Sequence, residues 1–323
     1  MRATLYLDQN ILGHIDSPQV SDLFVSLRKQ ERFPVISHNH LTEIGLSDDP
    51  EKFINRLKVL RPLFFSKEKS ESIHREGNVE LLEIDAEREI YWHLDNLREI
   101  EQKFFQAFFP MLKMSGGLGQ VELEEIVDDY VFSMRSSVTS LTGDMGWISK
   151  CLFGLPIRWK LRRAERQIRS NFKTADFETA ARKVSDIRRR IASLGRISQI
   201  PANQVAHSII AQLSEDERRD FIAMYPPGFA VGLLDRSQKL MNFALILFSY
   251  GAISGSGRVF GGKSVTQKSR YRAQILDCLH IGEASFFDAF ITCDAGAHRL
   301  AQVVYSYAGL PTNVVKMEIS GAG

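Results

Sequence analysis

Short apolar segments alternate with helical patterns at the start of the chain, and this alternation is the feature that most constrains the fold. The segments at 3–7 (ATLYL) and 33–37 (FPVIS) are typical of short buried strands. One helix begins at Pro18, and another follows Ser37, which can cap it. A third helix has Asp49 as its N-cap, followed by a proline in the first turn. Strand–helix–strand–helix of this kind predicts an α/β fold with a parallel sheet.

The same alternation returns at the end of the chain, where helical patterns and strand patterns again take turns. Helices are expected at 269–285 and 294–308, and strands at 287–292 and 312–317. The end of the chain therefore completes the α/β core that the beginning opens.

The middle of the chain has a different character, with helical periodicity and almost no strand signal between residues 85 and 250. We therefore expect one α/β core made of 1–65 and 255–323, interrupted by a large all-α insertion at 66–254.

Composition places the chain among globular proteins of a reducing compartment. Of its 323 residues, 44% are hydrophobic and 25% charged, which suits a chain with a sizeable core. The three cysteines are scattered, which argues against a disulfide framework or a cysteine zinc site and favours the cytoplasm. Arg2 brings charge too early for a signal peptide, and the apolar stretch from Leu240 is shorter than the ~18 residues of a membrane span. We expect no membrane association and a buried helix at that stretch.

Four acids stand at the ends of the predicted core elements: Asp8, Glu43, Asp277 and Asp294. Asp8 and Asp294 each follow a strand, and ligands of parallel sheets bind beyond the carboxyl ends of the strands. Clustered hard oxygen ligands favour Mg²⁺ or Mn²⁺, and one or two such ions can activate water and stabilise the leaving oxygen of a phosphodiester. Asp277 shares a helix face with His280 and Ala284, so that face can point at the metal.

Three segments that contain these acids, LYLDQNIL, VISHNHLTEI and ILDCLHIGEASFFDAFITCDAGAHRLA, resemble the motif blocks of PIN-like domain nucleases. The resemblance covers about 1–60 and 263–318, and it leaves out the helical middle. It implies a three-layer, Rossmann-like core and a metal-dependent nuclease, a phosphodiester hydrolase that acts on RNA. A toxin or a defence effector is the biological role that the family suggests.

The resemblance also implies roles for individual residues. The metal ligands and catalytic residues are Asp8, Glu43, Asp277 and Asp294, and the residues that hold them in place are Asn10, Ser37, His280 and Thr292. Apart from the resemblance, positive charge alone predicts contacts to the phosphate backbone. They are expected from Lys263, Lys268, Arg270 and Arg272, which lie just before Asp277, and from Arg162, Arg163, Arg166 and Arg169 in the insertion.

The acids also have a structural interpretation, which stays open at this point. Asp8 and Asp294 can be helix caps, and Asp288 is expected to be structural. His280 can be either a partner of the ligands or a core histidine, and His38 and His40 are expected at the surface. If all four acids are structural, the chain is a non-catalytic module that binds nucleic acid or protein.

The segment GRVFGGKS at 257–264 matches the pattern of a phosphate-binding loop. Such a loop needs a strand directly before it, and the preceding GAISGSG is typical of a loop instead. A P-loop nucleotide-binding protein is therefore the less favoured interpretation.

The insertion contains a strongly basic stretch. Residues 158–196 carry 13 Lys and Arg against 4 Asp and Glu. This excess can be a footprint for nucleic acid, a surface for an acidic protein partner or a second copy of the chain, or a solvated face. No series of aromatic residues indicates base stacking.

Overall fold

The computed structural model describes residues 4–45, 47, 49–65, 81–83, 88–89, 91–92, 95, 128, 131–132, 135, 159–167, 169–170, 177–195, 197–231, 236–253 and 265–319. The loop pattern at 257–264 and most of 66–176 lie outside these residues.

A six-stranded sheet in the order β4-β3-β2-β1-β5-β6 forms the centre of the described structure. The strands are β1 (Thr4–Leu7), β2 (Phe33–Ser37), β3 (Leu63–Phe65), β4 (Leu81–Glu83), β5 (Ala289–Thr292) and β6 (Asn313–Lys316). All neighbours pair in parallel except β3 and β4, so five strands form a parallel sheet with one antiparallel edge strand. The predicted α/β fold with a parallel sheet is confirmed.

The four strands expected from the sequence are β1, β2, β5 and β6, while β3 and β4 have no counterpart in the prediction. Because β4 lies within 66–254 and pairs with β3, the expectation that this insertion is all-α is wrong. Both of these strands are only three residues long, which is too short for an apolar alternation to be recognised.

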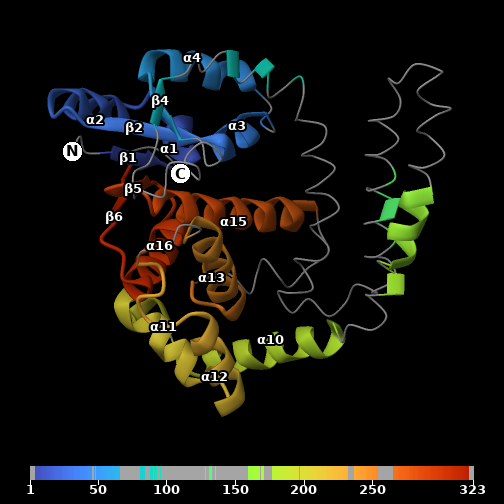
Figure 1. The fold of residues 1–323 in the computed structure, drawn as a ribbon. Coiled ribbons are helices and arrows are strands. Elements are labelled where there is room, and N and C mark those ends of the chain that lie inside the picture. The colour runs from blue at the N-terminus through green and yellow to red at the C-terminus, as the bar shows by residue number, and fades with distance from the viewer. Residues whose placement is uncertain are drawn as a thin grey trace.

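Helices cover both faces of the sheet. Those before β4 are α1 (Gln9–Gly13), α2 (Pro18–Lys29), α3 (His38–Gly45) and α4 (Pro50–Leu60). The later ones are α10 (Phe177–Ala192), the 3-10 helix η2 (Ile197–Gln199), α11 (Ala202–Ala211), α12 (Glu215–Met224), α13 (Arg236–Tyr250), α15 (Val265–Ala284) and α16 (Ala295–Ala308). Figure 1 shows α2 and α4 on one side of the sheet and α15, α16 and α13 on the other.

Alternation along each strand sends neighbouring side chains into different layers. Leu5 and Leu7 of β1 belong to the apolar cluster under α1, α2 and α4. Tyr6, between them, belongs to the cluster under α15 and α16. Strands buried on both faces are typical of parallel sheets with helices on either side, and this burial brings Tyr6 beneath α15.

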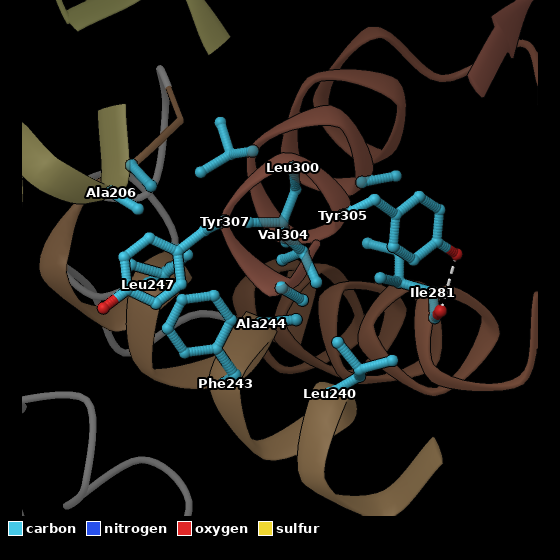
Figure 2. Close-up of a cluster of buried hydrophobic side chains, with 14 of the residues drawn as sticks. Ala206, Leu240, Phe243, Ala244, Leu247, Ile281, Leu300, Val304, Tyr305 and Tyr307 are labelled. Carbon is cyan, nitrogen blue, oxygen red and sulfur yellow. Dashed lines mark hydrogen bonds between the residues drawn. The ribbon is translucent and has the colours of Figure 1, made fainter. Parts of the chain in front are cut away.

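Helix α13 is part of the same core, although the predicted insertion at 66–254 includes it. Figure 2 shows where side chains of α13, α15 and α16 meet, with Leu240, Phe243, Ala244, Leu247, Ile281, Leu300 and Val304 among the labelled residues. Gly282 of α15 allows this approach, because a Cβ there would lie 2.5 Å from the carbonyl oxygen of Ser237 on α13.

The apolar stretch from Leu240 lies in α13, as a buried helix, which confirms that prediction. Across the ranges given above, no helix combines the length and apolar character needed to cross a membrane.

Candidate active site

The strand order of the sheet changes direction between β1 and β5. The first strands add on one side of β1, whereas β5 and β6 add on the other. At such a switch point the loops leaving the carboxyl ends of adjacent strands separate and leave room for a ligand. Asp8 follows β1 and Asp294 follows β5. The backbone amide of Asp8 donates to the carbonyl of Ile291 (2.9 Å), so the two strand ends lie side by side.

Asp8 is a buried acid, with 3% of its surface exposed. It occupies the N-cap position of α1, yet its carboxylate accepts no hydrogen bond from the amides of that helix. It accepts instead from the hydroxyl of Thr292 (2.5 Å). Helix capping therefore does not explain why the sequence places a carboxylate here.

Asn10 and Thr292 connect the two strand ends. The side-chain oxygen of Asn10 accepts from the amide of Cys293 (3.1 Å), and its nitrogen lies 3.4 Å from the hydroxyl of Thr292. Asn10 lies in the short helix α1, where Arg56 of α4 donates to the carbonyls of Leu12 and Gly13 (3.0 Å each). These bonds join α1 to the end of β5, and Thr292, which donates to Asp8, lies within them.

Asp294 is exposed and caps α16, because its carboxylate accepts from the amide of Ala297 (2.7 Å). Its own amide donates to the hydroxyl of Thr292 (3.0 Å). The predicted capping role is thus present, and the carboxylate stands at the same edge of the sheet as Asp8. Asp288 is structural as predicted, since it accepts from the amide of Thr4 (2.7 Å).

Glu43 and Asp277 reach this edge from α3 and α15. Glu43 accepts from the Nε2 atom of His280 (2.9 Å), and Asp277 accepts from the side chain of Gln274 (2.9 Å). Both acids are half-buried.

The charges of these acids act on one another. Burial raises the pKa of Asp277 well above its usual range, and the carboxylates of Asp8, Asp294 and Glu43 raise it further. Burial also raises the pKa of Asp8, against the lowering effect of His280 and of the Thr292 hydrogen bond. The carboxylates of Glu43 and Asp294 also raise the pKa of Asp8, so the charges of the other acids act on both Asp277 and Asp8.

A cation would relieve this repulsion, and the all-oxygen donor set has the chemistry of a Mg²⁺ or Mn²⁺ site. Among the residues that the structure describes, however, no group of three or more His, Cys, Asp or Glu side chains is arranged as it would be around a metal ion. The four carboxylates are suitable ligands for a hard cation, but in this structure the described side chains are not arranged around a common cation position.

A polar network beneath the acids includes two residues that the sequence did not single out, Tyr6 and Glu283. The hydroxyl of Tyr6 contacts Ser37 Oγ, His280 Nδ1 and Glu283 Oε2, each at 2.8 Å. Ser37 also donates to Glu283, so its hydroxyl serves this network. Glu283 follows His280 by three residues on α15, and the spacing that links Asp277 to His280 could have identified it.

His40 is fully buried, so the prediction that it lies at the surface is wrong. Its Nε2 atom lies 2.6 Å from the carbonyl oxygen of Leu7, and its Nδ1 atom accepts from the amide of Ser37 (3.0 Å). A spacing of two residues places His38 and His40 on different sides of α3, and one of these sides faces the core. His38 is exposed, as predicted.

The predicted backbone contacts are described in part. The side chains of Lys263, Lys268 and Arg270 lie outside the described residues, and Arg272 is half-buried on α15.

The helical segments at 159–167 and 169–170 carry the other four arginines. Arg169 pairs with Asp128 (2.7 Å) and lies 3.7 Å from Glu165, and Arg163 lies over the ring of Trp159. Arg162 and Arg166 are exposed. Part of the basic charge is therefore neutralised within the protein.

A groove of about 540 Å³ lies at the opposite, amino-terminal end of β2. Its lining is mainly apolar, with several charged side chains: Phe24, Leu27, Glu31, Arg32, Phe33, Pro34, Lys58, Leu60 and Arg61. None of the four candidate acids lines this groove, so the candidate site remains the one at the carboxyl ends of β1 and β5.

Comparison with known proteins found no matching family model, no matching curated protein and no matching solved structure. The chemistry of the site is therefore the basis for a functional proposal.

Proposed function

We propose that this chain is a Mg²⁺- or Mn²⁺-dependent nuclease that hydrolyses phosphodiester bonds, with RNA as its expected substrate. The observation that supports the proposal most is the electrostatic coupling of Asp277 with Asp8, Asp294 and Glu43 at the switch point of a parallel sheet. Repelling carboxylates are unfavourable in a folded core, and a bound cation would offset that cost.

The proposal includes the PIN-like architecture that the sequence motifs suggest, with a core of 1–65 and 255–323 to which β4 and α13, from the predicted insertion at 66–254, also contribute. It also includes a cytoplasmic location, where the free thiols of Cys278 and Cys293 would stay reduced. A role as a toxin or defence effector rests on the family resemblance alone.

The residues of the site divide into those that would hold the metal and those that orient them. Asp8, Glu43, Asp277 and Asp294 would supply the oxygen ligands. Thr292 and Asn10 orient Asp8 and the β5 end, while His280 orients Glu43. When bound, a divalent ion supplies an activated water and stabilises charge on the phosphate oxygens.

Basic residues would hold the substrate backbone. The start of α15, with Lys268, Arg270 and Arg272, leads directly to Asp277 on the same helix. Contacts of this kind to phosphates would add affinity without reading sequence. The exposed Arg162 and Arg166 of the insertion would extend the contact along a longer strand.

A non-catalytic binding module is the second candidate, and one observation favours it. No metal-type group of His, Cys, Asp or Glu is formed within the described ranges, and Asp294 already has a capping role. For the P-loop interpretation, the described element before 257–264 is a helix, α13, and the loop itself lies outside the described residues.

The test is a cleavage assay on end-labelled single-stranded RNA and DNA with Mg²⁺, with Mn²⁺ and with EDTA. The matched variants are Asp8→Asn at the site and Asp22→Asn on the exposed surface of α2. We expect metal-dependent cleavage by the wild type and by Asp22→Asn. Asp8→Asn should lose at least about 100-fold, because a metal ion contributes several kcal/mol of charge stabilisation. Cleavage of neither substrate under any condition would favour the binding module.

A further inference from the structure

A chain of hydrogen bonds connects Glu283, in the interior, to Glu43, at the site. Tyr6 lies 2.8 Å from Glu283 Oε2 and 2.8 Å from His280 Nδ1, and His280 Nε2 lies 2.9 Å from Glu43 Oε1. Tyr6 is 0% exposed and His280 is 1% exposed. Polar groups so deeply buried are costly unless each has a partner, and here each has one.

The partners of each atom fix the direction of the hydrogen bonds. Ser37 donates its hydroxyl proton to Glu283, and Tyr6 has a single hydroxyl proton, which goes to Glu283 or to the oxygen of Ser37. In either case the Nδ1 atom of His280 donates to the oxygen of Tyr6. On the other side, the Nε2 atom of His280 donates to the carboxylate of Glu43. Both ring nitrogens of His280 are therefore donors, and the ring is held at both ends.

His40 has the opposite pattern, although its ring centre is only 4.6 Å from that of His280. Its Nδ1 atom accepts from the amide of Ser37 and its Nε2 atom donates to Leu7, so its ring carries one proton. His40 thus fastens α3 to β1 through the backbone. The neighbouring His280 is left to orient a side chain of the site.

We propose that Tyr6 and Glu283 are positioning residues for Glu43, acting through His280. Glu283 holds the hydroxyl of Tyr6, Tyr6 holds the imidazole of His280, and His280 holds the carboxylate of Glu43 in the orientation that metal ligation requires. Residues behind a metal ligand commonly set its orientation in this way. This inference rests on the proposed metal-dependent function.

The test compares Tyr6→Phe with Tyr305→Phe. Tyr305 is also a buried tyrosine that bonds to α15, through its hydroxyl and the carbonyl of Ile281 (2.6 Å), as Figure 2 shows. Each variant loses one buried phenol hydroxyl, but Tyr305→Phe loses one hydrogen bond, worth about 1 kcal/mol, whereas Tyr6→Phe leaves three buried partners and should lose more stability. Denaturant unfolding of both variants is therefore measured beside the readouts below, which are taken under conditions where both variants are fully folded, and only Tyr6→Phe removes the support of His280.

The first readout is Mg²⁺ affinity, measured by calorimetry. We expect Tyr6→Phe to bind Mg²⁺ about 10-fold more weakly, the lower end of the effect of removing a direct partner of a metal ligand, because Tyr6 acts one residue further back, through His280. Tyr305→Phe should bind within about 2-fold of the wild type. Cleavage by Tyr6→Phe should return to nearly the wild-type rate at saturating Mg²⁺, because positioning and not chemistry is lost. Equal affinities in the two variants would overturn the inference.

The second readout does not depend on metal or activity. The Nε2–H proton of His280, assigned by its absence in His280→Gln, should give a slowly exchanging NMR resonance in the wild type and in Tyr305→Phe. It should broaden or vanish in Tyr6→Phe. An unchanged resonance in Tyr6→Phe would overturn the inference even if the wild type bound no metal. A wild type without metal binding or cleavage would overturn the proposed function instead.

A second variant, Glu283→Gln, tests the same inference if Tyr6→Phe does not fold. Glu283→Gln keeps the shape of the side chain but weakens its acceptance from Tyr6 and Ser37. It should weaken Mg²⁺ binding in the same direction. Because both residues act through His280, the double variant should be no weaker than the weaker single variant. Fully additive losses would show that the two residues act separately and would contradict the proposal.

Discussion

Asp277 carries the clearest electrostatic signature of the site. It lies on the face of α15 that also presents His280, and burial together with three neighbouring acids raises its pKa well above the usual range. An acid with a raised pKa destabilises the fold at every pH where it must be ionised. The Asp277 carboxylate therefore lowers the stability of the metal-free protein, and its proposed role as a metal ligand would explain its presence.

Asp277→Asn should make the metal-free protein more stable at pH 7. The raised pKa means that the folded state favours the protonated acid, so the cost is absent below about pH 4 and grows as the pH rises through the folded-state pKa. The gain on substitution, on the order of 1 kcal/mol, should follow the same course. Denaturant unfolding in EDTA at pH 4 and pH 7 measures it.

The control is the same substitution at Asp288, whose carboxylate accepts from the amide and hydroxyl of Thr4. Asp288→Asn should not stabilise the protein at either pH. A loss of stability at pH 7 in Asp277→Asn would show that the acid is a structural partner.

Helix α15 contributes Asp277, His280 and Glu283 to the site and its polar network, and the sequence allowed this to be predicted in part. Asp277 and His280 share a face by spacing alone. The same helical spacing could have identified Glu283, whereas no local pattern identifies its partner Tyr6. In the sequence, Tyr6 is typical of a buried strand residue. Its contact with Glu283 joins positions 277 residues apart. Such a contact depends on how α15 is placed across the sheet, which local patterns do not encode.

Other elements show the same division between local and distant information. The N-cap of α4 at Asp49 is confirmed, because a cap involves only neighbouring residues. The burial of His40 was missed, because the depth of α3 depends on its packing against β1. Similarly, the pairing of Arg169 with Asp128 joins separate segments of the insertion.

The basic segment of the insertion should contribute to binding through its exposed arginines. Arg162→Glu/Arg166→Glu should weaken binding to single-stranded RNA and reduce the slope of log affinity against log salt by about 1.4, since each lost phosphate contact contributes roughly 0.7. Titrations at several salt concentrations measure the slope. A substrate too short to reach the insertion should still be cleaved.

The control for net charge is Lys29→Glu/Lys52→Glu, which changes two exposed lysines on α2 and α4. It should leave the salt slope nearly unchanged. If both double variants behave alike, the arginines do not form a specific contact, and a solvated face or a protein partner becomes the better interpretation.

In the whole molecule, the parallel sheet brings together acids that are far apart in the chain. Asp8 and Asp294 follow the neighbouring strands β1 and β5, and Glu43 and Asp277 lie on the helices α3 and α15 (Figure 1). One strand end alone would leave a carboxylate that a cap or turn could explain. Our proposal that these four carboxylates form a cation site at the switch point is the central claim.

Calorimetric titration of Mg²⁺ into the metal-free protein tests this claim most directly, with wild type, Asp277→Asn and Asp288→Asn compared at pH 7. We predict saturable binding to the wild type and to Asp288→Asn, and loss of most of that affinity in Asp277→Asn. The melting temperature of the wild type should rise with Mg²⁺ and fall again with EDTA, because an ion that binds only the folded state stabilises it. No saturable binding of Mg²⁺ or Mn²⁺ to the wild type, or equal binding to Asp277→Asn, would contradict the claim.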